Sequence, residues 1–106
     1  ALTISESYDP SAAADIENFI KNMVPYDEEF MTHTSEGPDD SPSHIKSVLF
    51  QQSIGLIVED GELLLGTWQG IYLAEFRRSA QSRKILLKFM PDTSRSRIGP
   101  ISTLLP

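Results

Sequence analysis

The sequence predicts an α+β fold, in which two helices pack on one face of a mainly antiparallel sheet. Two segments, residues 9–24 and 41–49, combine helix-start residues with apolar positions. Residues 53–89 have the alternating apolar pattern and the short connections that are typical of antiparallel strands. The length of 106 residues allows one domain at most.

The beginning of the chain predicts the end of a strand, over residues 2–4, followed by a helix. Asp9 suits the N-cap of that helix and Pro10 its first position. We expect the helix to end at Val24, because the residue before Pro25 avoids the α region. Between these ends, apolar residues recur at the spacing of one helix face: Ile16, Phe19, Ile20 and Met23.

A polar loop over residues 26–43 separates the two predicted helices. It is rich in Ser, Thr, Asp, Gly and Pro, and loops of this length are usually functional or disordered. The second helix is expected to begin at Ser41, which would act as N-cap with Pro42 in the first helical position.

The second half of the chain predicts an antiparallel meander. Asp60-Gly61 is a strong hairpin signal between strands at residues 54–59 and 62–65. Further strands are expected at 70–76 and 83–89. The strand at residues 2–4 has no partner in this meander, so we expect upstream strands or a second chain to pair with it.

Residues 1–89 are predicted to form the domain, and residues 90–106 an irregular C-terminal tail that contains three prolines. We expect the natural N-terminus to lie upstream, because the chain opens without Met and already in strand-like sequence.

Composition excludes several classes of function. Fifteen acidic and nine basic residues give a net charge of −6, which argues against a nucleic-acid-binding surface. The absence of cysteine excludes disulfides, thiolate metal sites and cysteine nucleophiles. The sequence contains no apolar run of membrane-span length and no signal peptide, so a cytoplasmic location without membrane contact is expected.

Both histidines of the chain, His33 and His44, flank the turn-rich part of the polar loop. Gly-Pro and Ser-Pro pairs between them favour a loop that folds back, which would bring the two rings together. Two imidazoles and a carboxylate suit Zn²⁺ or a similar divalent ion. The spacing matches no standard metal motif, so an acidic surface loop without a metal is the alternative.

Three acids are candidates for catalysis. Asp39 and Asp40 could position a metal ion or accept a proton, or they could offset the macrodipole of the second helix. Glu6 follows a strand and precedes a helix, where functional groups often lie, although an exposed acid without a role is equally consistent.

Trp68 and Gln69 lie between two glycines in strand-like sequence. Glycine in such a place indicates a bulge or the close approach of a backbone or ligand. Trp68 could stack on a flat ring and Gln69 could hydrogen-bond to it, or Trp68 could belong to a core or an interface.

Three motifs resemble those of the YjbQ-like family. "LTISESYDP" is similar to the family's "LTINENxDP", "HTSEGPDDSPSHIKSVL" to "HTxEGPDDMPAHIKASL", and "DGELLLGTWQGIYLAEFR" to "GxLxLGTWQGIYLxEFR". The resemblance spans residues 1–89. It departs at Ser5 and Ser7, where asparagines are common, and the family has further strands and a His-Thr-Ser segment before the position of Ala1.

The resemblance implies a homotrimer that binds zinc or another divalent ion, such as magnesium, through His33 and His44. It also implies a secondary thiamine-phosphate synthase activity, which joins a pyrimidine diphosphate to a thiazole phosphate and releases pyrophosphate. In that reaction Asp39, Asp40 and Glu6 are the predicted catalytic residues, and Trp68, Gln69 and Arg77 would bind the substrates, with Arg77 on a phosphate. The alternatives are a non-catalytic trimeric protein and a fragment without function.

Overall fold

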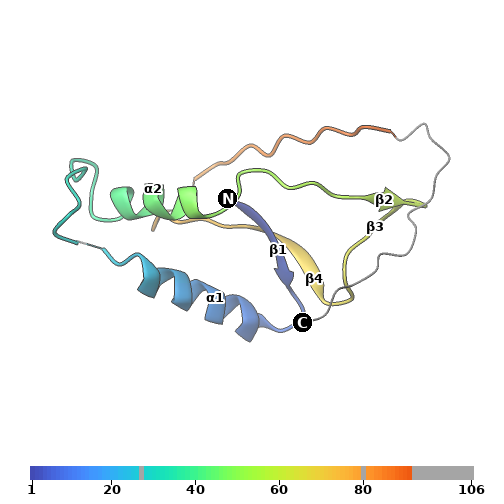
Figure 1. Cartoon of the computed structure of the whole chain (residues 1–106), viewed down its shortest axis with the longest axis horizontal. Helices are drawn as coiled ribbons and strands as arrows, with labels where there is room; N and C mark the ends of the chain where they lie inside the picture. Colours follow the sequence, from blue (N-terminus) through green and yellow to red (C-terminus); the bar gives the residue numbers. More distant parts are fainter. Residues whose placement is uncertain (27, 80, 92–106) are drawn as a thin grey trace, which may run out of the picture.

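The structure, a computed structural model, describes residues 1–26, 28–79 and 81–91 (Figure 1). Its elements confirm the predicted α+β class. In chain order they are β1 (Leu2–Glu6), α1 (Pro10–Met23), α2 (Asp40–Leu49), β2 (Val58–Glu59), β3 (Glu62–Leu63) and β4 (Gln69–Leu73). Most of the predicted tail at residues 90–106 lies outside the described residues.

Strand β1 pairs antiparallel with β4, in a register that joins Leu2 to Leu73 and Glu6 to Gln69. The expectation that this first strand lacks a partner within the chain was therefore wrong. The predicted meander was wrong as well, because β1–β4 and β2–β3 form separate two-stranded sheets in the described part of the chain. A meander pairs neighbours along the sequence, whereas β4 returns to β1 only after both helices and the hairpin.

The hairpin at Asp60-Gly61 is confirmed but shorter than expected. Both residues have positive φ, 51° and 78°, as a type I′ turn requires. Hydrogen bonding continues past the strands, since Leu64 N–H donates to Ile57 C=O at 2.9 Å.

The strand expected at residues 83–89 is not formed. This segment runs apart from β4 in Figure 1, and Leu86 and Leu87 are 91% and 90% exposed. Strand composition alone did not produce a strand here, because no described strand edge lies alongside to supply hydrogen bonds.

Helix α1 has the predicted ends. The Asp9 Oδ1 atom accepts a hydrogen bond from Ser11 N–H at 2.9 Å, and Val24 caps the other end before Pro25. Helix α2 begins at Asp40 rather than after Ser41, with Asp39 at the N-cap position. Pro42 therefore lies later in the first turn, where its missing N–H is still not needed.

Neither helix in the described part of the chain has the length and apolar character of a membrane span.

The two helices and the β1–β4 sheet line a partly open cavity of about 960 Å³. Thr3 and Tyr72, opposite each other in the register, line it from the sheet, and Ile20 and Lys46 line it from α1 and α2. Side chains alternate across a strand, so Ile71, which does not line the cavity, belongs to the other face and is partly exposed there.

Candidate metal centre

His33, Asp40 and His44 form a compact cluster at the start of α2. Asp40 and His44 are one helical turn apart and share a face, and His33 reaches them from the preceding loop. That loop reverses through Gly37, which has φ 104°. The two imidazole centroids are 5.4 Å apart, so the hypothesis that the turn-rich segment brings both rings together agrees with the structure.

The Oδ2 atom of Asp40 is the centre of the cluster. It lies 3.0 Å from His33 Nε2 and 3.1 Å from His44 Nε2. Asp40 is 1% exposed, whereas the His33 and His44 side chains are 58% and 55% exposed. The carboxylate thus forms the floor of the site and the two rings form its solvent-facing walls.

The other carboxylate oxygen, Asp40 Oδ1, faces Arg77. The Arg77 Nη2 atom lies 2.9 Å away, close enough for an ion pair. The geometry does not give Oδ1 a well-aligned hydrogen bond from any described residue, so this contact is mainly electrostatic. Asp40 therefore divides its oxygens, with Oδ2 turned to the imidazoles and Oδ1 to a guanidinium.

These three side chains fit a divalent metal ion. Their ligand atoms all lie within 4.8 Å of one another. Ligand atoms of a tetrahedral zinc ion lie roughly 3.3 Å apart, close to the separations of Oδ2 from each Nε2. To bind a metal, each ring must present an unprotonated Nε2 and carry its proton on Nδ1. Without a metal, the same Nε2 atoms can donate hydrogen bonds to Oδ2.

Asp39 lies outside this cluster. Its Oδ2 accepts a hydrogen bond from the backbone N–H of Arg78 at 3.0 Å. That bond, assisted by the charges of Arg78 and Arg77, lowers the pKa of Asp39 below its ordinary value. This hydrogen bond therefore connects the segment after β4 to the start of α2. It lies next to Arg77, which contacts Asp40. The predicted catalytic role of Asp39 stays a prediction.

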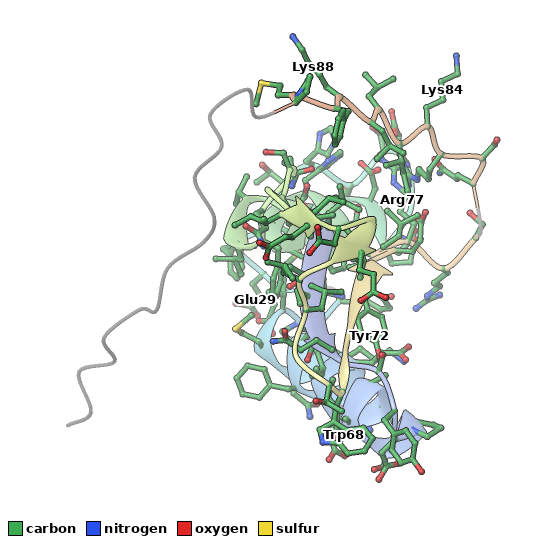
Figure 2. All side chains as sticks on the ribbon, turned by 90° about the vertical axis from the view of Figure 1, so that its right-hand side faces the viewer. Glu29, Trp68, Tyr72, Arg77, Lys84 and Lys88 are labelled. Atoms are coloured by element: carbon green, nitrogen blue, oxygen red, sulfur yellow. The ribbon has the colours of Figure 1, made fainter. Side chains whose placement is uncertain are left out.

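Glu6, Trp68 and Gln69 lie at the far end of the β1–β4 sheet. Figure 2 shows Arg77 well above Trp68, with Tyr72 between them in height. The strand from Gln69 to Leu73 alone covers about 13 Å, and Arg77 lies four residues farther along the chain. One chain therefore does not bring these three residues to the histidines, and their predicted roles are untested.

Local contacts explain the conformation around Trp68. Its ring packs on Tyr8, with centroids 4.8 Å apart, and its carbonyl accepts the Ser7 N–H at 2.7 Å. Gln69 Oε1 accepts the Gly66 N–H at 2.7 Å and so closes the turn before β4. The contact of Tyr8 with Trp68 was not foreseen from the sequence.

Lys46 is a second residue that sequence reasoning missed. It is 3% exposed and its Nζ lies 5.4 Å from the centroid of the Tyr26 ring. A lysine within a helix normally indicates a solvent-facing position. No local signal distinguished this one, because its burial depends on a contact with a distant loop.

Comparison with known proteins matches residues 1–92 to a family model described as "UPF0047 protein YjbQ-like". The UPF0047 protein YjbQ of Salmonella typhimurium is 46% identical over 86 residues, covering 81% of this chain and 62% of that protein. UPF0047 protein MJ1081 of Methanocaldococcus jannaschii is 44% identical over 91 residues, covering 86% and 62%. UPF0047 protein sll1880 of Synechocystis is 38% identical over 87 residues, covering 82% and 59%. This chain thus spans about three fifths of the length of these relatives.

Proposed function

We propose that this chain, which belongs to the YjbQ-like UPF0047 family, is a divalent-metal protein whose ligands are His33, Asp40 and His44. One observation carries the proposal: a single buried carboxylate oxygen lies 3.0 and 3.1 Å from two imidazole nitrogens. Two nitrogens and one oxygen suit zinc, whereas magnesium prefers oxygen ligands throughout. The donor set therefore favours zinc over magnesium.

The exposed rings leave the outer side of the centre open to solvent, as a catalytic rather than a purely structural metal site requires. A bound ion would supply positive charge for an anionic ligand or leaving group. Asp40 would hold the ion from below, and His33 and His44 would set the direction of the open side. Arg77 would keep Asp40 in place through Oδ1.

The reaction we propose is the secondary thiamine-phosphate synthase reaction, with a pyrimidine diphosphate and a thiazole phosphate as substrates and pyrophosphate as a product. The motif resemblance over residues 1–89 supports it. The position of Arg77 is compatible with a phosphate contact, because its side chain is 31% exposed and a guanidinium has donors beyond the one facing Asp40.

A homotrimer without catalytic activity is the second candidate. Strands β1 and β4 each have one neighbouring strand in the described part of the chain, and their outer edges are open except at Leu2, whose N–H donates to Gln51 C=O at 3.0 Å. Ile71 adds partly exposed apolar surface on the face of the sheet away from the cavity. Sedimentation of the purified chain tests this candidate, and a stable monomer with intact activity would exclude it.

Metal titration against a chromophoric chelator tests the metal centre. Wild-type protein should bind one zinc ion per chain, and Asp40→Asn or His44→Gln should weaken binding on the order of 100-fold or more. Asp39→Asn is the matched control, because it removes the same charge one residue away and keeps an acceptor for Arg78 N–H. The proposal would be refuted if Asp40→Asn and Asp39→Asn lost zinc affinity equally, or if the wild type bound no zinc.

Turnover of the pyrimidine diphosphate is measured separately. His44→Gln should lower metal content and pyrophosphate release together. Zinc binding without pyrophosphate release in the wild type would keep the metal centre and remove the proposed reaction.

A further inference from the structure

Lys46 is an ammonium group buried without a described counter-charge. It is 3% exposed, and no described carboxylate lies within ion-pair distance of it. Arg78 approaches the same aromatic ring, with its Cζ 4.5 Å from the Tyr26 centroid. Burying an ammonium is costly without a partner, and one aromatic ring offsets only part of that cost. Two cations gathered at one ring therefore leave a positive site.

This positive site opens into the cavity of about 960 Å³ between the helices and the sheet. Its volume is in the range of small-molecule sites. Lys46, Arg78 and Tyr26 line one part of it. The apolar part of the lining includes Ile16, Ile20, Val24, Phe50 and Phe76.

The acids that line the cavity are already paired. Glu17 lies 3.2 Å from Lys21, and Glu75 makes hydrogen bonds of 3.0 and 3.1 Å to Arg83. Neither carboxylate is therefore available to neutralise Lys46. Asp39 lies near Arg78, but no described carboxylate pairs with Lys46, so an anionic ligand would balance a charge that the described residues leave unmatched.

The cavity is distinct from the candidate metal centre. His44 and Lys46 are two residues apart on α2, so their side chains leave the helix axis about 200° apart. One faces Asp40 and the other faces the cavity. Arg77 lines the cavity and contacts Asp40, which makes it the one described residue shared by the two places.

We propose that this cavity binds an organic anion, whose carboxylate or phosphate head contacts Lys46 and Arg78 and whose apolar body lies against α1. Lys46 and Arg78 supply the charge, and Tyr26 holds both cations at one end. The apolar body fills the space beside Ile16 and Ile20. The site requires no metal.

Calorimetry tests this site by measuring how tightly small probes bind to the full chain in the presence of excess EDTA. Phenyl phosphate and benzoate should bind, and benzamide, which has the same ring without the charge, should bind at least about tenfold more weakly. Inorganic phosphate should also be weak, because it lacks the apolar body. The comparison of phenyl phosphate with benzoate tells which head group the site prefers.

Four variants locate the bound anion. Lys46→Met keeps the apolar stem and should weaken phenyl phosphate about tenfold while leaving benzamide unchanged. Lys84→Met removes the same charge from an exposed position and should change the affinity for neither phenyl phosphate nor benzamide. Ile20→Trp should fill the cavity and lower the affinity for both probes. Arg78→Gln provides a second test of the charge if Lys46→Met fails to fold.

Three results would overturn the proposal. The first is phenyl phosphate binding that EDTA abolishes, which would place the anion at a metal instead. The second is equal binding by Lys46→Met and the wild type, and the third is the absence of probe binding to the wild type at millimolar concentration.

Discussion

Asp40 and Arg77 form an ion pair, with Oδ1 and Nη2 2.9 Å apart, between the first residue of α2 and the segment that follows β4. The neighbouring residues repeat the connection, since Asp39 accepts the Arg78 N–H. Asp39 and Asp40 on one side, and Arg77 and Arg78 on the other, thus connect the start of α2 to the segment after β4. The carboxylate between His33 and His44 owes its orientation to this double contact.

Removal of the Arg77 charge should therefore destabilise the protein. Arg77→Gln leaves a buried carboxylate without its cation, and we expect a loss of about 1–3 kcal/mol, below the cost of a fully buried pair because Arg77 is partly exposed. Urea unfolding in EDTA measures it. Arg83→Gln, which breaks the exposed pair with Glu75, should cost less than about 1 kcal/mol. Similar losses in both variants would show that Arg77 has no special structural role.

Zinc should raise the melting temperature if the three ligands belong to the folded state. Free zinc at about 100 times Kd stabilises a protein by about 2.7 kcal/mol when the unfolded chain does not bind it. Scanning calorimetry with and without zinc should show this shift for the wild type and for Asp39→Asn. The shift should disappear in Asp40→Asn, and its persistence there would mean that zinc binds elsewhere.

Local signals determined what the sequence could predict. Both ends of α1 carry such signals, in Asp9 and in Val24 before Pro25, and both were confirmed. The approach of His33 and His44 was expected for the same reason, because turn-forming residues occupy the segment between them.

Contacts between distant residues were not predictable in this way. Nothing within Leu2–Glu6 identifies β4 as its partner. The sequence around Lys46 likewise does not predict its contact with the Tyr26 ring. Residues 83–89 show the reverse case, in which strand composition is present and a pairing edge is not.

The Asp9 cap should lose its effect in acid. The Ser11 backbone N–H lowers the pKa of Asp9 from its ordinary value of 3.8 in the folded state. The carboxylate therefore contributes stability above the unfolded pKa, and this contribution is lost as the pH falls through the lower folded pKa. Asp9→Asn keeps a neutral cap at every pH. As the pH falls from 6 to 3, urea unfolding should show the free energy of unfolding of Asp9→Asn rising relative to that of the wild type. A difference that stays constant with pH would contradict this role of the charge.

Gly70 should not tolerate a larger side chain. A Cβ at this position would lie 2.5 Å from Ser7 Oγ and 2.8 Å from Ser7 Cβ. Gly70→Ala should cost about 1–3 kcal/mol of unfolding free energy, because the β1–β4 pairing holds both backbones in place. Combination with Ser7→Gly removes the obstructing atoms and should recover most of the loss. A double variant as unstable as Gly70→Ala would place the cause in the backbone instead.

Trp68 and His44 lie toward opposite ends of β4, because Trp68 precedes this strand and His44 is joined through Asp40 to Arg77, which follows it. Any turnover that depends on both must therefore join residues of two chains, and Trp68→Ala should leave zinc affinity unchanged. If they meet across the interfaces of the proposed trimer, a refolded mixture of Trp68→Ala and His44→Gln chains regains activity that neither variant has alone. Random mixing in equal amounts leaves roughly a quarter of the interfaces with both native residues. Recovery of about that fraction of wild-type pyrophosphate release would place the site between subunits, and no recovery would separate Trp68 from the chemistry at His44.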